Sequence, residues 1–204
     1  MPPRFLYFDL GKVLVDFDHE RMFRQMGAVV GVDSQRMRIA VQESGLQKQY
    51  ELGTISGPEF HAALCSSLAC TADYEQLNRA GCEIFQLNDS MLPVVGDLKR
   101  AGCRMGILSN TCAPHWEYCL REFPMLREFF DVYALSCRIG ACKPEPAIFL
   151  TAAELAGVAP AEIFFTDDIA EHVVAARAVG FDAVQYTGTP ALVEELRDRG
   201  LLNP

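Results

Sequence analysis

The feature that most constrains the fold of this chain is a series of short apolar runs separated by segments of helical periodicity. Residues 5–8 form the first run, which does not alternate with polar residues and is therefore typical of a strand buried on both faces. Strands that alternate with helices form βαβ units around a parallel sheet. The sequence thus predicts an α/β fold with a Rossmann-like parallel sheet. Similar runs follow at residues 104–108, 132–135, 163–165 and 183–186.

One long segment interrupts this alternation. The first helix of the sheet is predicted at residues 91–98, where apolar side chains share one helical face. About 70 residues separate it from the first strand, whereas a strand–helix connection usually takes about 2–6 residues. Residues 16–85 have helical patterns only, so we predict a small α-helical cap inserted after the first strand. The core domain would comprise residues 1–15 and 86–204, and the cap would cover the carboxyl ends of the strands, where open α/β sheets bind ligands.

The charge of the chain bears on its partners. Lys and Arg number 18 and Asp and Glu number 27, which gives a net charge of −9. Nucleic acids and anionic membranes attract positive surfaces, so we expect neither as a partner. A phosphorylated small molecule needs only one local positive site and is compatible with this charge. The sequence does not indicate an oligomeric state.

The eight cysteines do not indicate a disulfide framework or a zinc site, because no pair has CxxC spacing. We predict reduced and mostly buried thiols. The N-terminal residues carry acids within their apolar run and lack the layout of a signal peptide. No run approaches the roughly 20 apolar residues that span a bilayer. We therefore expect a cytoplasmic protein.

Polar residues follow the predicted strands at their carboxyl ends, which meet at one edge of a parallel sheet. A carboxylate there can attack phosphorus and form an aspartyl-phosphate. A lysine can offset the charge of the phosphate, paired carboxylates can hold Mg²⁺, and small donors can bind the phosphate oxygens. The residues are Asp9 after the first strand, Ser109 and Asn110 after the second, Lys143 after the third, and Asp167 with Asp168 after the fourth.

Each of these residues also has a simpler structural interpretation. Asp9 is compatible with a turn, and Lys143 with a solvated loop. Asp168 and Glu171 have the spacing of a capping box for a helix over residues 169–179, and residues 109–111 could cap the helix that follows them. The occurrence of all four groups in order, each after a strand, favours the functional interpretation.

The four groups together resemble the motifs of the haloacid dehalogenase superfamily of phosphohydrolases, over essentially the whole chain. The motifs are FDLG at residues 8–11, LSN at 108–110, KP at 143–144 and FTDD at 165–168. The segment at residues 50–56 resembles the cap loop of members with a small helical cap. The DLG opening, the stretch from Leu108 to His115 and the cap segment are similar to the bacterial α-D-glucose-1-phosphate phosphatase subgroup.

The resemblance implies a Mg²⁺-dependent phosphomonoester hydrolase that acts on a small phosphorylated metabolite, such as a hexose 1-phosphate or another sugar phosphate. It implies an aspartyl-phosphate intermediate with Asp9 as the nucleophile. The implied metal ligands are Asp9, the backbone carbonyl of Gly11, Asp168 and, in an assisting role, Asp167, and the implied phosphate- or substrate-binding residues are Lys143, Ser109, Asn110 and His115.

One position departs from the pattern of the superfamily's phosphatases. Most of them have a second Asp two residues after the nucleophile, which acts as general acid and base, and this chain has Gly11 there. Such a group typically contributes about 10²–10⁴-fold to the rate. Adjacent Lys12 is a poor base because it is charged. Three alternatives therefore stay open: a catalytically impaired binding protein, a 2-haloacid dehalogenase, and a phosphotransferase.

Overall fold

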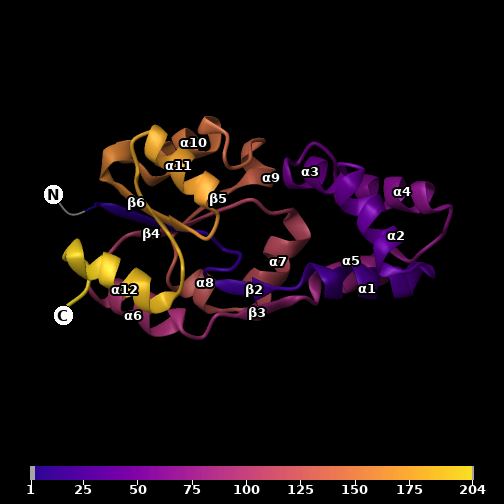
Figure 1. The fold of residues 1–204 in the computed structure, drawn as a ribbon, viewed down its shortest axis with the longest axis horizontal. Helices are drawn as coiled ribbons and strands as arrows, with labels where there is room; N and C mark the ends of the chain where they lie inside the picture. The colour runs from indigo at the N-terminus through magenta and orange to yellow at the C-terminus, as the bar shows by residue number, and fades with distance from the viewer. Residues whose placement is uncertain (1–2, 204) are drawn as a thin grey trace.

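The computed structural model describes residues 3–203 and contains a five-stranded parallel sheet in the order β5-β4-β1-β6-β7. The predicted α/β fold with a Rossmann-like parallel core is therefore confirmed. Each strand lies within one residue or two of a predicted apolar run, and β1 occupies the centre of the sheet (Figure 1). The strands are β1 (Phe5–Phe8), β4 (Met105–Ser109), β5 (Val132–Leu135), β6 (Ile163–Asp167) and β7 (Asp182–Gln185).

Helices cover both faces of the sheet, because β1 is apolar on both sides. Leu6 and Phe8 belong to one apolar cluster, and Phe5 and Tyr7 belong to the other, as expected where successive side chains alternate between faces. Helices α6 and α12 lie on one side and α10 and α11 on the other (Figure 1). The core helices are α6 (Met91–Arg100), α7 (Ala113–Glu122), α8 (Met125–Glu128), α9 (Ser136–Ile139), α10 (Pro146–Ala156), η2 (Pro160–Glu162), α11 (Ala170–Ala178) and α12 (Thr189–Asp198).

A separate group of helices, here called the cap, lies at one end of the molecule (Figure 1). These helices enclose an apolar cluster of their own, which includes Phe23, Met37 and Leu64. Several begin at a side-chain cap, and Ser56 forms a capping box with Glu59. The cap helices are α1 (His19–Val30), α2 (Ser34–Arg38), η1 (Ile39–Glu43), α3 (Leu46–Glu51), α4 (Gly57–Leu68) and α5 (Tyr74–Cys82).

Two strands at the ends of this segment correct the prediction that residues 16–85 contain helices only. Strand β2 (Val15–Phe17) leads into the cap and β3 (Phe85–Leu87) leads out of it, and the two form an antiparallel ribbon. Each strand is only three residues long and its partner is far away in the chain. Local periodicity cannot show such a pairing, because it depends on where the cap returns to the core.

The cysteines are unpaired within the described part of the chain, and four of them are buried. The other four are half-buried, so burial is less complete than the sequence predicts. Across residues 3–203, no helix combines the length and the apolar character that crossing a bilayer requires.

The centre of the sheet provides a stability prediction. A Cβ atom at Gly106 in β4 would lie 2.8 Å from the Val132 carbonyl oxygen and 2.6 Å from the Tyr7 ring. We expect Gly106→Ala to lower the free energy of unfolding by about 1–3 kcal/mol in urea denaturation, because backbone and buried rings must move. Gly96→Ala in α6 is the control, since its nearest neighbour is the end of the Arg100 side chain at 3.4 Å. That variant should gain up to about 1 kcal/mol. Equal effects at the two positions would contradict this account of the sheet.

Candidate active site

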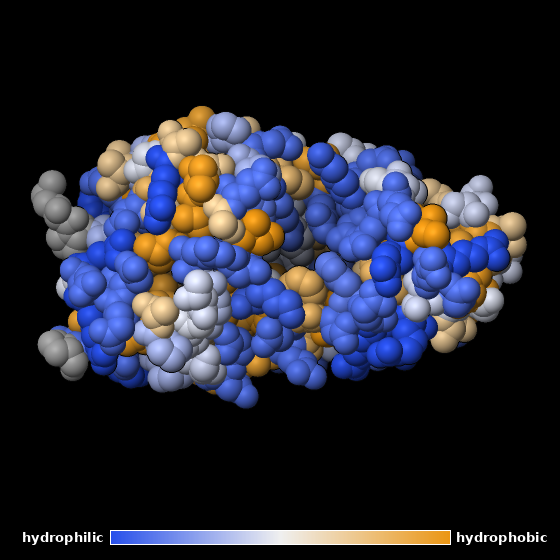
Figure 2. All heavy atoms as spheres, viewed as in Figure 1, coloured by the Kyte–Doolittle hydropathy of each residue, from blue (hydrophilic) through white to orange (hydrophobic). Residues whose placement is uncertain are grey.

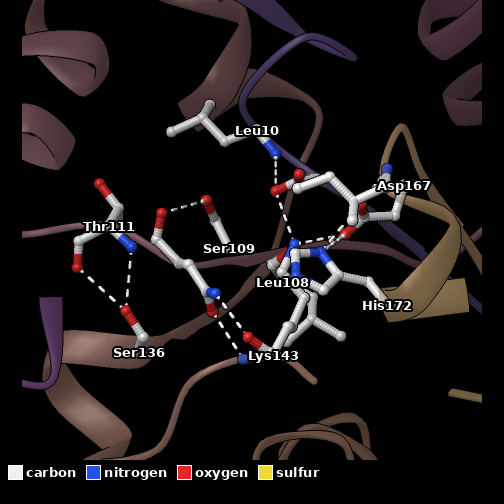
Figure 3. A network of polar contacts seen from close by, with 11 residues as sticks. Leu10, Leu108, Ser109, Thr111, Ser136, Lys143, Asp167 and His172 are labelled. Carbon is white, nitrogen blue, oxygen red and sulfur yellow. Dashed lines mark hydrogen bonds and ion pairs between the residues drawn. The ribbon is translucent and has the colours of Figure 1, made fainter. Parts of the chain in front are cut away.

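The side-chain ammonium of Lys143 lies at the centre of a buried polar network (Figure 3). Its Nζ atom is 2.9 Å from Asp9 Oδ1 and 2.6 Å from Asp167 Oδ2, and it donates to the Leu108 carbonyl oxygen at 3.0 Å. An ammonium has three N–H donors, so each one has an acceptor. Burial by itself lowers the pKa of Lys143, but the two carboxylates outweigh it and raise the pKa above its usual value. The lysine is therefore held charged in the interior.

Asp9 is the first residue after the central strand. Its backbone N–H donates to the Thr166 carbonyl oxygen at 2.9 Å, and its Oδ1 accepts from the Leu10 N–H at 2.7 Å. These bonds hold the carboxylate at the strand end, beside Lys143. Burial raises the pKa of Asp9 to about 6; Asp167 adds to this effect and Lys143 opposes it.

Asp167 is engaged on both of its carboxylate oxygens. Oδ1 accepts from the Ile169 N–H at 2.8 Å, and both oxygens lie 3.0 Å from His172 Nδ1. Burial raises the pKa of Asp167, but Lys143 and His172 outweigh burial and hold it below the usual value. In this structure Asp167 thus fixes Lys143 in position. Sequence reasoning missed His172; its only signal is a polar residue within a helix, five residues after Asp167.

Asn110 binds the backbone of Lys143 at two points. Its Nδ2 donates to the Lys143 carbonyl oxygen at 2.9 Å, and its Oδ1 accepts from the Lys143 N–H at 2.7 Å. The amide predicted to bind phosphate is therefore used to position the lysine. Neighbouring Ser109 is buried at the end of β4, and its hydroxyl makes only a 3.4 Å contact with the Asn110 carbonyl oxygen. This weak contact leaves the Ser109 hydroxyl available for a ligand.

The simpler interpretations as helix caps are wrong. Helix α11 begins after Ile169 and α7 begins after Cys112, and neither helix has a side-chain cap. The Asp168 carboxylate therefore does not form the capping box with Glu171. Lys143, at 3% exposed, is not a solvated loop lysine either.

Three carboxylates at this edge of the sheet form a group that fits a metal ion. Asp9, Asp167 and Asp168 each offer an oxygen, and these oxygens lie within 4.8 Å of one another. Together with Lys143 they carry a net charge of −2 when ionised, which a divalent cation would balance. Burial and the charge of Asp167 raise the pKa of Asp168. Hard oxygen donors of this kind suit Mg²⁺. Gly11 follows Asp9 by two residues and forms a bridge with Val15.

His115 lies apart from this network, on the side of α7 that faces the cap. Its Nε2 is 3.2 Å from the Gly81 carbonyl oxygen, and its ring packs edge-on against Phe85. Burial, with a smaller effect from His19, lowers the pKa of His115 to about 4. The residue predicted to reach the substrate is therefore a neutral side chain at the contact between cap and core.

The comparisons with known proteins agree with this fold. Residues 6–180 match the family described as haloacid dehalogenase-like hydrolase. The match spans most of the chain, and this protein belongs to that family. The prediction of a hydrolase of this superfamily is confirmed; the assignment to the glucose-1-phosphate phosphatase subgroup stays a prediction.

Individual relatives align over most of their length. A D-ribitol-5-phosphate phosphatase of Bacteroides thetaiotaomicron is 25% identical over 189 residues, which cover 88% of this chain and 90% of that protein. A solved enzyme of the family from the same organism, in complex with magnesium and inorganic phosphate, has 27% identity and a TM-score of 0.80, covering 90% and 93% of the two chains. A HAD-like hydrolase structure from Porphyromonas gingivalis has 28% identity and a TM-score of 0.81, covering 97% and 99%.

The buried ion pairs provide a second prediction. Lys143→Met keeps much of the side-chain volume but leaves Asp9 and Asp167 as unpaired buried carboxylates. We expect a loss of about 3–5 kcal/mol in the free energy of unfolding, measured in urea without added metal. The double variant Lys143→Met/Asp167→Asn should recover part of this loss, because one buried charge is gone. Additive losses in the double variant would contradict the pairing.

His115 provides a prediction for stability against pH. Its pKa of about 4 in the folded protein lies below the usual 6.5, so the unfolded chain binds more protons between these values. The contribution of neutral His115 to stability is complete above pH 6.5 and is lost as the pH falls to 4. We expect it to reach about 3 kcal/mol in urea unfolding at several pH values. His115→Gln keeps a donor for Gly81 and should flatten this part of the profile; identical profiles would contradict the assignment.

Proposed function

We propose that this protein is a Mg²⁺-dependent phosphomonoester hydrolase that acts on a small phosphorylated metabolite. The observation that carries the proposal is the buried Lys143 ammonium, shared by Asp9 and Asp167 at the edge of the sheet where Asp168 also lies. An incoming phosphate dianion is repelled by a carboxylate nucleophile unless cations are close. The ammonium and a divalent ion would supply those cations. The magnesium and phosphate in the related Bacteroides structure support the same chemistry.

The residues at the strand ends divide the work of the proposed reaction. Asp9 would attack phosphorus through a carboxylate oxygen and form an aspartyl-phosphate, which water then hydrolyses. Lys143 stays charged and offsets the negative charge on the phosphoryl group, while Ser109 donates its hydroxyl to a phosphate oxygen. Asp9, Asp168 and the Gly11 carbonyl, with Asp167 assisting, would hold Mg²⁺, which supplies charge neutralisation at the phosphoryl group when bound.

The entrance to this site favours a substrate rich in hydroxyl groups. The molecular surface is hollowed where the cap meets the core, and hydrophilic residues border the hollow (Figure 2). Amide, ammonium and carboxylate groups can bind the hydroxyls of a sugar or a sugar alcohol. The similarity to a D-ribitol-5-phosphate phosphatase supports this substrate class. A pocket between α3 and the loops that carry Asn110 and Lys143, here called the hollow, is lined by Gln42, Gln47, Lys48, Glu51, Asn110, Cys142 and Lys143.

The alternatives account for fewer of these observations. A 2-haloacid dehalogenase works without a metal, and the three clustered carboxylates would then repel one another with only Lys143 to offset them. A binding protein without catalysis would explain Gly11, but it would not need the Asp9 carboxylate beside a buried ammonium. Phosphate release distinguishes hydrolysis from transfer to a second sugar.

The proposal predicts that phosphate release requires both Mg²⁺ and Asp9. A panel of sugar, sugar-alcohol and nucleotide phosphates should include at least one substrate whose hydrolysis stops with EDTA and returns with added Mg²⁺. Asp9→Asn should abolish turnover and leave the circular dichroism spectrum unchanged, because the amide cannot act as the nucleophile. Asp131→Asn is the matched control, since Asp131 is exposed and pairs only with Lys99 among the described side chains.

Four results would contradict the proposed function or its mechanism. Turnover by Asp9→Asn, or turnover of the wild type in EDTA, would exclude the mechanism. Chloride release from a 2-haloacid without metal, with no phosphate release from the panel, would favour the dehalogenase instead. Stabilisation by sugar phosphates without hydrolysis over hours would favour the binding protein.

A further inference from the structure

The position that lacks the second carboxylate is already filled. A Cβ atom at Gly11 would lie 2.7 Å from Cε1 of Phe17, so the Phe17 ring occupies the space of a side chain there. The ring is itself held in place, because the His19 ring and the Lys12 ammonium each lie 4.7 Å from its centre. A proton donor for the proposed phosphatase reaction must therefore come from another part of the chain.

The neighbouring Lys12 does not replace it. Its ammonium donates to the Phe17 carbonyl oxygen at 2.8 Å and lies 3.6 Å from Asp16. Both contacts are with residues of β2, so the Lys12 side chain lies along this strand. A charged, exposed ammonium is also a poor base.

Glu51, the last residue of α3 in the cap, lines the hollow beside Asn110 and Lys143. Among the described residues, it is the only carboxylate in this lining. Its pKa is raised by burial, with a smaller opposing effect from Gln47. A carboxyl group of this kind holds a proton more readily than an exposed glutamate, which suits general acid catalysis.

The backbone of Glu51 is fixed to the edge of the active site. The buried hydroxyl of Ser136 donates to the Glu51 carbonyl oxygen at 2.6 Å and accepts from the Thr111 N–H at 2.9 Å. Thr111 follows Ser109 and Asn110 in the chain (Figure 3). Gly53, with φ of 68°, brings the next turn so close to the Cys137 carbonyl that a Cβ atom would lie 2.2 Å from that oxygen. The end of α3 therefore has a defined position relative to the loop that follows Ser109.

The carboxylate is also oriented. Gln47, one turn earlier on α3, donates through Nε2 to Glu51 Oε1 at 2.7 Å. The other end of the Gln47 amide, Oε1, is buried and has no hydrogen-bond partner in the part of the chain that the structure describes. A hydroxyl group of a bound substrate would satisfy this acceptor. Gln47 and Glu51 thus form a hydrogen-bonded pair in the lining of the hollow beside Asn110 and Lys143.

We propose that Glu51 is the general acid and base of this enzyme, in place of the carboxyl group that Gly11 lacks. This inference rests on the proposed phosphatase function. As Asp9 forms its bond to phosphorus, the bond between phosphorus and the leaving oxygen breaks, and that oxygen takes the proton of Glu51. The Glu51 carboxylate then takes a proton from water as the water oxygen attacks phosphorus. The bond between phosphorus and Asp9 breaks, which releases inorganic phosphate and restores both carboxyl groups.

Leaving-group dependence tests this role, with Glu51→Gln as the variant. Glutamine keeps an acceptor for Gln47 but cannot give a proton. The two substrates are 4-nitrophenyl phosphate and a sugar-alcohol phosphate. The 4-nitrophenolate ion leaves without protonation, whereas the sugar-alcohol alkoxide needs a proton to leave. We expect the pre-steady-state burst of 4-nitrophenolate to stay within about threefold of wild type, while single-turnover release of the sugar alcohol slows by about 10²–10⁴-fold. Steady-state turnover of both substrates should fall, because water attack also lacks its base.

The controls separate this proposal from the proposed function. Glu43→Gln changes an exposed cap carboxylate outside the hollow and should leave both substrates unaffected. In Glu51→Gln, the 4-nitrophenolate burst and the single-turnover release of the sugar alcohol could slow equally, or neither could slow. Either result would overturn the role of Glu51 while the phosphatase function stands. If wild type hydrolyses no phosphate ester of the panel, the proposed function itself fails.

Discussion

The placement of one ammonium in the interior is the constraint on which the rest of this structure depends. Burying the charge of Lys143 is unfavourable unless every N–H finds an acceptor, and the acceptors come from three separate strand ends. Asp9 comes from β1, Leu108 from β4 and Asp167 from β6. The same interaction keeps two carboxylates ionised side by side. Stability and the proposed chemistry therefore use the same contacts.

The order of the strands brings the three acceptors of the Lys143 ammonium together. Strand β1 lies between β4 and β6, and all three run in the same direction, so their carboxyl ends form one edge. Lys143 reaches this edge from the loop before α10, and Asn110 holds its backbone there at two points. Asn110 and His172 thus help to set the geometry of Lys143 and Asp167.

The insertion of the cap directly after β1 places the cap close to Asp9 in the chain. Only five residues lie between Asp9 and β2, so the ribbon that carries the cap begins at the active site. Phe17 from this ribbon closes the space beside Gly11, and Ser136 binds the end of α3 to the loop after Ser109. The cap is therefore joined to the core by the β2–β3 ribbon and is also held at the end of α3 by a buried hydroxyl.

The parallel α/β core could be predicted from the sequence, because buried strands and helix faces repeat within windows of a few residues. The sequence also placed Asp9, Ser109, Lys143 and the Asp167–Asp168 pair after strands, since strand ends and residue types can be seen locally. The β2–β3 ribbon and the position of His115 became visible only in the folded structure. The same is true of the contacts of Asn110 with Lys143 and of His172 with Asp167. These features join residues that are far apart in the chain or, as with His172, place a polar side chain on the buried face of a helix. Their geometry depends on how the helices and strands pack together, and no local sequence pattern predicts it.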